Sequence, residues 1–283
     1  MKKYKIGYTT GVFDMFHIGH LNILRRAKEQ CDYLVVGVST DELVQHDKNK
    51  TPIIPFEERV RIVQSIRYVD EVVPQIDKNK LRAWQRIHFD AMFVGSDWQG
   101  SPQWEEFERQ FKPLGVDIVY LTHTDGISST LLREKITPPI LNNVKIGYTQ
   151  GTFDLFHIGH LNLLKHAQEL CEYLIVGVNS DNLVRAYKNK TPIINESERA
   201  EIVRNIKGVD ECYIVTTLDK MKAHEKFLFD VIFIGDDWRG NPRWEQTKLD
   251  LGAIGVDLVF LPHTSGISSS ALSEVLLHNQ KLK

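Results

Sequence analysis

The sequence predicts an α/β protein made of two tandem Rossmann-like domains, each a doubly wound parallel sheet with helices on both faces. Three observations support this prediction. Apolar strand-like runs alternate with helical patterns, which calls for right-handed crossovers between parallel strands. Runs such as Tyr33–Val38 are apolar enough to be buried on both faces of a sheet. Shifting the sequence by 140 positions aligns Lys5–Ile136 with Lys145–Leu276 without a gap, and roughly half of the aligned residues are identical.

The elements of the first copy follow from the spacing of its apolar residues. Short apolar runs predict strands at Tyr4–Thr9, Tyr33–Val38, Glu71–Pro74, Ala91–Gly95 and Ile118–Leu121. Helical patterns between them predict helices from Ile18, near Asp41–Val44, at Phe56–Ile66, around Lys80–Ile87, at Gln103–Phe111 and from Ser128. We expect the second copy to repeat this order, with ligands bound beyond the carboxyl ends of the strands in both.

The repeat is a duplication of a whole domain, because it is far longer than the units of about 20 to 50 residues that build solenoids. We therefore expect copy one at residues 1–136, a linker at 137–144 and copy two at 145–283. At about 3.5 Å per residue, residues 137–143 of this linker reach roughly 25 Å at most, so the two domains are expected to be neighbours.

The composition is that of an ordinary soluble protein: the 283 residues are 42% hydrophobic and 25% charged. A net charge of -2 argues against a nucleic-acid partner, because no basic surplus exists to displace counterions. No segment is long enough to span a membrane, and the apolar run after the basic start is expected to be a strand and not a signal peptide. Cys31 and Cys171 precede equivalent strands, so we expect buried thiols and a cytoplasmic location.

One stretch after the first strand occurs in both copies. It reads GVFDMFHIGH at residues 11–20 and GTFDLFHIGH at residues 151–160. The histidines fall at the turn where a strand is followed by a helix, and a helix N-terminus offers unpaired N–H groups and a partial positive charge. Gly19 lets the backbone come close to a ligand, and imidazoles separated by two residues can point at the same phosphate. The stretch therefore predicts a phosphate site.

This extended pattern, with Gly-Ile-Ser-Ser about a hundred residues later, resembles the small cytidylyltransferases of the His-x-Gly-His nucleotidyltransferase superfamily. Glycerol-3-phosphate cytidylyltransferases are the nearest match, and the resemblance runs through nearly all of each copy. It also rests on residues 48–50, 58–59, 67–72, 95–98 and 126–129. Single-domain members pair as homodimers, so the resemblance implies an internal pseudo-dimer of the two copies, in a chain that can be a monomer.

The resemblance assigns catalysis to histidine, lysine and arginine side chains of both copies: His17, His20, Lys48, Lys50, Arg59, His157, His160, Lys188, Lys190 and Arg199. The histidines would bind the triphosphate and stabilise charge as it builds on the α-phosphate. The string KNKTPII is identical at residues 48–54 and 188–194, which suggests a shared task, although such lysine pairs are usually solvated. The arginines match a family arginine that contacts phosphates, with a solvated helix arginine as the alternative.

A second group is expected to bind the nucleotide. In copy one it comprises Thr10, Gly11, Val12, Phe13, Asp14, Gly19, Asp97, His123, Thr124, Gly126, Ile127, Ser128 and Ser129. In copy two it comprises Gln150, Gly151, Thr152, Phe153, Asp154, Gly159, Asp237, His263, Thr264, Gly266, Ile267, Ser268 and Ser269. The aspartate of the signature could instead be only a helix-entry residue, and the serines can cap a helix as well as hold phosphates.

The reaction that the resemblance implies is attack by a phosphomonoester oxygen on the α-phosphorus of a nucleoside triphosphate. The partners would be CTP and a small phosphorylated alcohol, first of all glycerol 3-phosphate, with Mg²⁺ arriving on the triphosphate. The alternatives are phosphoethanolamine, phosphocholine or a sugar-alcohol phosphate as the acceptor, and ATP as the donor. An alternative of another class makes one copy a non-catalytic binding or regulatory module. No zinc-type ligand cluster is evident, and no protein residue is expected to ligate a metal.

Three departures from the family pattern concern the two sites. His123 and His263 stand where the family usually has arginine before the Gly-Ile-Ser-Ser turn. Copy one has Val12 where copy two has Thr152, and Ser96 where copy two has Asp236. Copy two, conversely, has Lys207-Gly208 in place of Arg67-Tyr68. We therefore expect two nucleotide sites of unequal activity.

Overall fold

A computed structural model describes residues 2–48, 51–122, 145–264, 269 and 272–274. The chain divides into two compact units, residues 1–127 and 128–283. The expected linker and the helix expected from Ser128 lie outside the described residues.

Each unit contains one five-stranded sheet, and all neighbouring strands run parallel. In copy one the order is β3-β2-β1-β4-β5, with β1 (Tyr4–Gly11), β2 (Cys31–Ser39), β3 (Glu71–Gln75), β4 (Ala91–Gly95) and β5 (Asp117–Leu121). The chain builds outward from β1 through β2 to β3, then crosses to β4 on the other side, so the switch point lies between β1 and β4. The predicted doubly wound fold is confirmed.

Copy two has the same topology. Its strands, in the order β10-β9-β6-β7-β8, are β6 (Ile146–Gly151), β7 (Tyr173–Asn179), β8 (Glu211–Val215), β9 (Val231–Gly235) and β10 (Asp257–Leu261). The central strand is β6, the counterpart of β1, and the signature stretch again follows it.

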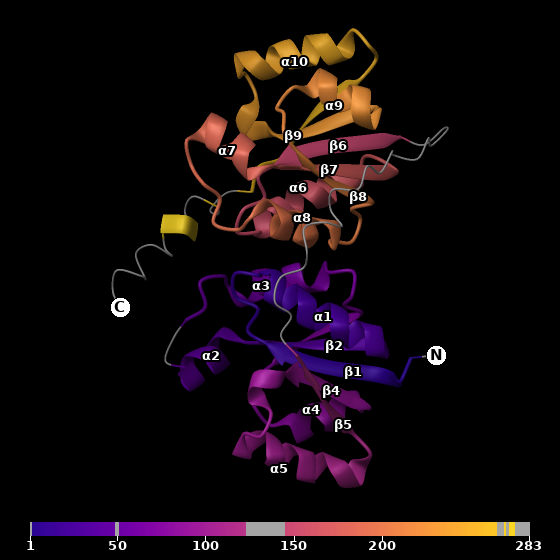
Figure 1. Ribbon diagram of the computed structural model, residues 1–283, viewed down its shortest axis with the longest axis vertical. Coiled ribbons are helices and arrows are strands. Elements are labelled where there is room, and N and C mark those ends of the chain that lie inside the picture. Colours follow the sequence, from indigo (N-terminus) through magenta and orange to yellow (C-terminus); the bar gives the residue numbers. More distant parts are fainter. Residues whose placement is uncertain (1, 49–50, 123–144, 265–268, 270–271, 275–283) are drawn as a thin grey trace. The chain divides into compact units, whose positions relative to one another are not determined.

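Helices cover both faces of each sheet (Figure 1). In copy one they are α1 (Ile18–Gln30), α2 (Asp41–Lys48), α3 (Phe56–Gln64), α4 (Lys80–Ile87) and α5 (Pro102–Phe111). Their counterparts are α6 (Ile158–Gln168), α7 (Asp181–Lys188), α8 (Glu196–Arg204), α9 (Lys220–Phe227) and α10 (Pro242–Gly252). The first and third helices of each unit lie on one face, and the fourth and fifth lie on the other. Short 3-10 turns, η1 (Ser96–Trp98) and η4 (Asp236–Trp238), follow β4 and β9.

Burial of one apolar stripe fixes each helix on its sheet. Leu21, Leu24 and Ala27 of α1 recur at helical spacing, and none of them is exposed. On the opposite face, Tyr8 of β1 stacks on Phe89 with ring centroids 4.9 Å apart and belongs to the core beneath α4 and α5. This packing holds the carboxyl end of β1 in place, where the signature stretch begins.

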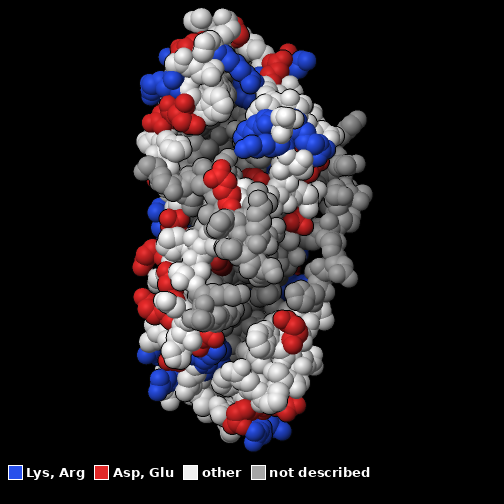
Figure 2. Space-filling view, turned by 90° about the vertical axis from the view of Figure 1, so that its left-hand side faces the viewer, with Lys and Arg blue, Asp and Glu red and all other residues white. Residues whose placement is uncertain are grey.

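The three cysteines are all free thiols. Cys31 and Cys212 are buried free thiols, and Cys171 is a partly buried one. No described helix has the length and apolar character needed to cross a bilayer. Figure 2 shows Lys and Arg side chains interspersed with Asp and Glu on the face drawn.

Candidate active site

Two stacked histidines open the helix that follows the central strand. His17 caps α1: its Nδ1 accepts a hydrogen bond from the backbone N–H of Gly19 at 3.1 Å. The Nδ1 of His20 accepts from the backbone N–H of His17 at 3.4 Å, and the two ring centroids lie 3.8 Å apart. A Cβ at residue 19 would lie 2.9 Å from Cε1 of His17, so this position requires glycine. Copy two repeats the geometry with His157 and His160.

These hydrogen bonds fix the tautomer of the rings. Because each Nδ1 accepts a backbone hydrogen bond, the neutral ring carries its proton on Nε2 and donates from there. Burial, with a smaller effect of His263, lowers the pKa of His157 to about 4. Burial also lowers the pKa of His20 to about 3 and holds the pKa of His160 well below its ordinary value. The pair in copy two therefore consists of two neutral N–H donors at pH 7.

Ser269, near the C-terminal end of copy two, lies beside this histidine pair. Its Oγ donates to the backbone oxygen of Asp154 at 2.7 Å and lies 3.4 Å from Nε2 of His157. With its proton committed to Asp154, the hydroxyl oxygen can accept from the imidazole. The serine of the Gly-Ile-Ser-Ser turn thus lies beside the signature, as a shared phosphate site would require.

The two arginines expected to contact phosphates lie behind the signature loop instead. Arg199 is 1% exposed; its guanidinium donates to the backbone oxygens of Ile194, Thr152 and Asn179 and pairs with Asp181. Arg59 is equally buried and binds the backbone oxygens of Ile54 and Val12 and the carboxylate of Asp41. Each guanidinium is buried and donates to protein oxygens, and Arg199 does not line the cavity described below. We therefore correct the expected role of both arginines from phosphate contact to positioning of the loop.

The signature aspartates also act on the protein backbone. The carboxylate of Asp154 accepts from the N–H groups of Ile193 and Ile194 at 2.8 and 2.9 Å, and Asp14 makes the same bonds to Ile53 and Ile54. Asp154 is 8% exposed and does not line the cavity described below. Expected to bind the nucleotide, it instead ties the signature loop to the KNKTPII segment.

Strain in the signature loop explains why it needs these ties. Phe153 and Leu155 have φ values of 55° and 46°, in the left-handed region that residues with a Cβ rarely adopt. Phe13 and Met15 repeat this at 56° and 47°. Such conformations persist where the surroundings over-determine them, and they concentrate at functional sites.

In copy two a cavity of about 390 Å³ opens over the signature loop. Its lining includes these residues expected from the sequence: Gln150, Gly151, Thr152, Phe153, His157, Gly159, His160, Lys188, Asp237, His263, Thr264 and Ser269. Lys190 is exposed and does not line it. Gly266, Ile267 and Ser268 lie outside the described residues.

In copy one the expected residues lie at the carboxyl ends of the central strands, as in copy two. Thr10 and Gly11 end β1, Val12 and Phe13 follow it, and Asp97 lies in η1 directly after β4. Lys48 is the last residue of α2. The positions of Lys50, His123, Thr124, Gly126, Ile127, Ser128 and Ser129 lie outside the described residues.

A buried lysine in each copy was not expected from the sequence. Lys220 lines the cavity, is 6% exposed, and donates from Nζ to Oε1 of Gln150 at 2.5 Å. Burial, assisted by Arg243, lowers its pKa to about 7. In copy one, Lys80 donates to Oγ1 of Thr10 at 3.2 Å, and burial lowers its pKa to about 8. The available signal was a lysine at the same position of both copies, opening the helix after the third strand.

A chain of neutral hydrogen-bonding groups extends from this lysine across the cavity. Nε2 of Gln150 donates to Oδ1 of Asn179 at 2.7 Å, and Nδ2 of Asn179 donates to the hydroxyl of Tyr187 at 3.0 Å. That hydroxyl lies 3.2 Å from Oγ1 of Thr152. Oδ1 of Asp236 accepts from the backbone N–H of His263, a residue that lines the cavity, at 2.9 Å. The departures noted in the sequence therefore bear directly on the cavity.

A family model described as "Cytidylyltransferase-like" matches residues 8–135 and again residues 148–275, which together make up most of the chain. The chain belongs to the cytidylyltransferase-like family. This cytidylyltransferase is thus a nucleotidyltransferase with two tandem copies of the family domain, each carrying the histidine pair.

Relatives of this cytidylyltransferase fall into two groups by length. An ethanolamine-phosphate cytidylyltransferase of Dictyostelium discoideum is 28% identical over 96% of this chain and 91% of its own length. One from Mus musculus is 30% identical over 72% of this chain and 68% of its own length. A glycerol-3-phosphate cytidylyltransferase of Bacillus subtilis is 41% identical, over 45% of this chain and 94% of its own length. The second type therefore matches one copy at a time.

The cavity of this cytidylyltransferase has the chemistry of a polyphosphate site. Lys188, Lys220 and Arg243 line it, while Asp237 is the one carboxylate among the described lining residues. The histidine N–H donors and the N-terminus of α6 lie at the same edge of the sheet. Such groups can bind phosphate oxygens and stabilise charge that builds on them.

Proposed function

We propose that this protein transfers CMP from CTP to glycerol 3-phosphate, giving CDP-glycerol and pyrophosphate. The observation that carries the proposal is the cavity of copy two, in which three basic side chains and two neutral histidines line the same space. Donor and acceptor are both phosphates, and their repulsion opposes the approach of the reacting atoms. Cations and fixed N–H donors around both molecules offset that repulsion.

The reaction needs no nucleophile from the protein, because the acceptor phosphate is already anionic at pH 7. One of its oxygens attacks the α-phosphorus of CTP and forms a new P–O bond. The bond from the α-phosphorus to the oxygen that bridges to the β-phosphate breaks, and pyrophosphate leaves. His157 and His160 donate from Nε2 to phosphate oxygens as their charge grows, and Lys220 holds the acceptor phosphate.

The neutral groups beside Lys220 favour a polyol acceptor. Gln150, Asn179 and Tyr187 present amide and hydroxyl groups, which suit the hydroxyls of glycerol. An ammonium group would need a carboxylate or an open aromatic face. Lys220 Nζ already lies 5.6 Å from the ring centroid of Trp244, so that face is taken.

Phosphoethanolamine is the second candidate acceptor, with two observations in its favour. The relatives that match nearly the whole chain include an ethanolamine-phosphate cytidylyltransferase. In addition, Asp237 and its neighbour Trp238 line the cavity, and Trp238 is 44% exposed. A carboxylate beside an exposed indole can receive an ammonium group.

We further propose that Mg²⁺ binds with CTP. The described residues hold no cluster of three or more His, Cys, Asp or Glu that could cage a metal ion. Asp237 is a single carboxylate in the cavity, a donor set that fits an ion ligated chiefly by phosphate oxygens and water. When bound, Mg²⁺ would neutralise part of the negative charge of the triphosphate.

Pyrophosphate release tests the proposal when CTP and ATP are each combined with glycerol 3-phosphate and with phosphoethanolamine. We expect CTP with glycerol 3-phosphate to give a kcat/KM at least about tenfold above the other pairs, the scale of one well-placed set of polar contacts. A preference for phosphoethanolamine would select the second candidate. Turnover with ATP in place of CTP would contradict both.

A further inference from the structure

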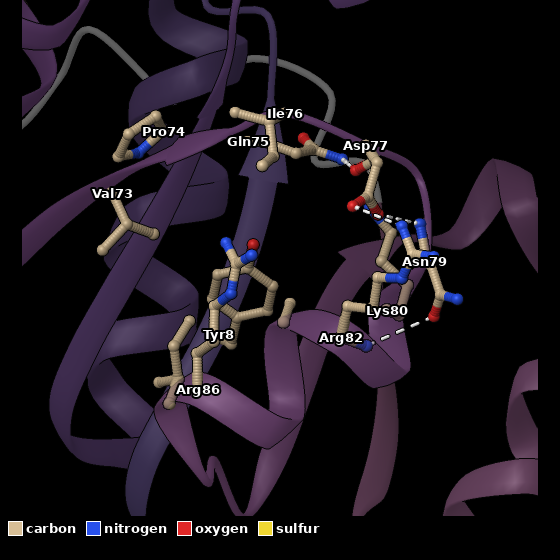
Figure 3. Close-up of a pocket in the computed structure, with 12 residues that line it drawn as sticks. Tyr8, Val73, Pro74, Gln75, Ile76, Asp77, Asn79, Lys80, Arg82 and Arg86 are labelled. Atoms are coloured by element: carbon tan, nitrogen blue, oxygen red, sulfur yellow. Dashed lines mark hydrogen bonds and ion pairs between the residues drawn. The ribbon is translucent and has the colours of Figure 1, made fainter.

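Copy one contains a cavity of about 340 Å³ between edge strand β3 and helix α4, and the histidines do not line it (Figure 3). Aliphatic side chains such as Val73 and Ile87 form much of its wall. Tyr8 and Arg86 lie together on one side, and Lys80 and Arg82 lie on the other. The cavity therefore combines an apolar interior with cations at its edge.

Copy two shows what occupies the corresponding region there. Tyr213 replaces Val73 and Phe227 replaces Ile87, and their ring centroids lie 5.0 Å apart. The Phe227 ring also stacks on Tyr148, the counterpart of Tyr8, at 5.4 Å. Lys226 Nζ lies 5.5 Å from the centroid of Tyr213 and 5.1 Å from that of Phe227. Copy two thus fills this region with two aromatic rings near one cation.

Copy one keeps the cation and lacks both rings. Arg86 takes the place of Lys226, and a guanidinium stacks on aromatic rings better than an ammonium does. Charge also favours an anion, because Lys80, Arg82 and Arg86 face a single carboxylate among the lining residues, Asp77. Asp77 pairs with Arg82 at 3.5 Å, and the side chains are 32% and 65% exposed, so this ion pair is weak.

The cavity also presents a hydroxyl group that a ligand can use. Tyr8 is 2% exposed, and its hydroxyl makes no hydrogen bond within the part of the chain that the structure describes. In copy two the Tyr148 hydroxyl donates to Oε1 of Gln150 at 3.0 Å, but copy one has the shorter Thr10 at that position. The Tyr8 hydroxyl therefore remains available to hydrogen-bond water or a polar group on a ligand.

We propose that this cavity binds a small planar aromatic acid. The ring occupies the region that Tyr213 and Phe227 fill in copy two, and Arg86 stacks on it. The anionic group binds Arg82 at the edge of the cavity, while Lys80 keeps its hydrogen bond to Thr10. Binding requires no nucleotide and no turnover, so the site stands independently of the function proposed above.

The test uses 3-phenylpropionate, which has one ring and a carboxylate and no phosphate that could make it an acceptor. Ligand-observed NMR titration of the full chain without nucleotide is expected to give a dissociation constant in the submillimolar to millimolar range, as is usual for a ligand of this size. The uncharged 3-phenylpropan-1-ol is expected to bind at least about tenfold more weakly, because it lacks the charge-assisted hydrogen bonds. Saturating glycerol 3-phosphate should leave binding unchanged.

Two variants make the test specific for the cavity. Val73→Tyr with Ile87→Phe introduces the aromatic residues of copy two and should weaken binding of the acid at least about tenfold, with pyrophosphate release unchanged. Arg82→Gln changes a side chain that is 65% exposed, so it spares the fold even if the double variant does not. It should weaken binding of the acid about tenfold and leave binding of the alcohol as it was, because only the acid has the anionic group that Arg82 binds. The proposal is overturned if the wild-type chain does not bind the acid, if the Arg82→Gln variant binds it as tightly, or if glycerol 3-phosphate displaces it.

Discussion

The imidazoles of His157 and His160 are neutral at physiological pH, because burial lowers both pKa values. They can stabilise a transition state only as N–H donors, and loss of one such donor lowers kcat by about 10²- to 10³-fold. We expect His17→Ala with His157→Ala to lower kcat by at least that factor while circular dichroism stays unchanged. His46→Ala is the control, because that ring is 87% exposed. A double variant that keeps most of its turnover would refute this role.

Lys220 should make acceptor binding depend on pH. Burial, with Arg243, lowers its pKa to about 7, so it loses its charge as the pH rises through that value. The acceptor dianion then loses a cation, and we expect KM for glycerol 3-phosphate to rise above about pH 7. In the His17→Ala chain only copy two is expected to turn over, so the KM of that chain shows the effect of Lys220. In the His157→Ala chain, which reports copy one, the rise should begin near pH 8, the pKa of Lys80.

Lys220→Arg is the control for this pH dependence, because a guanidinium keeps its charge throughout the range. Its KM should stay level where that of the parent chain rises. Identical midpoints for the two copies, or a rise that persists in Lys220→Arg, would rule out the lysines as its origin.

At the scale of single residues, the sequence predicted the site residues that lie in local motifs. It did not predict the roles that depend on partners distant in the sequence. The histidines, Lys188 and Asp237 lie in or beside motifs, and all of them line the cavity of copy two. Arg199 looks like a phosphate ligand in the sequence. Its partners include the backbone oxygen of Thr152 and the carboxylate of Asp181, and no local pattern shows that these would bury it.

At the scale of elements, apolar spacing gave the bounds of α4 and β4 as the structure has them. The predicted bounds of other elements differ from the structure at their ends. α2 continues past Val44 to Lys48 with polar residues, which carry no apolar signal, and β1 continues to Gly11 because β2 pairs with it as far as Val38. Pairing along a strand depends on its neighbours, so periodicity alone does not reveal where it stops.

The buried arginine of α8 provides a prediction about this part of the fold. Arg199 connects α8 to the strained signature loop and to the carboxylate at the start of α7. Removing one partner of a buried ion pair costs about 3 to 5 kcal/mol. We expect Arg199→Ala to lower hydrogen-exchange protection throughout copy two by free energies of that size.

Two controls accompany this measurement. Peptides of copy one report from the same chain and should keep their protection. Arg185→Ala, on an exposed residue of α7, should change protection by less than about 0.5 kcal/mol. If Arg199→Ala keeps full protection and loses only nucleotide affinity, the arginine acts on the phosphates after all.

At the scale of the whole molecule, duplication raises the question of how the chain assembles. The short linker holds the copies at high effective concentration, which favours pairing within the chain over pairing between chains. We propose an internal pseudo-dimer and expect sedimentation equilibrium to give the mass of one chain. A stable dimer of chains, independent of concentration over the measured range, would contradict this arrangement.

Both copies are expected to catalyse the reaction, at different rates. Both keep the stacked histidines and the buried lysine, which are the parts that hold phosphates in the proposed mechanism. They differ in the groups around that lysine, where copy one has Thr10, Ser39 and Asp47 in place of Gln150, Asn179 and Tyr187. Shared phosphate ligands predict two nucleotides bound per chain, while different surroundings of the acceptor predict unequal turnover.

Calorimetric titration with CTP measures the first expectation, and turnover of His17→Ala and His157→Ala separately measures the second. Each single variant should retain one working copy, so their kcat values should differ and should sum to about that of the wild-type chain, as expected for distant, independent sites. One nucleotide per chain, together with one variant that turns over like the wild type, would make the other copy a binding or regulatory module. Two nucleotides with wild-type turnover in one variant would separate binding from catalysis, because that copy would then hold CTP without transferring CMP.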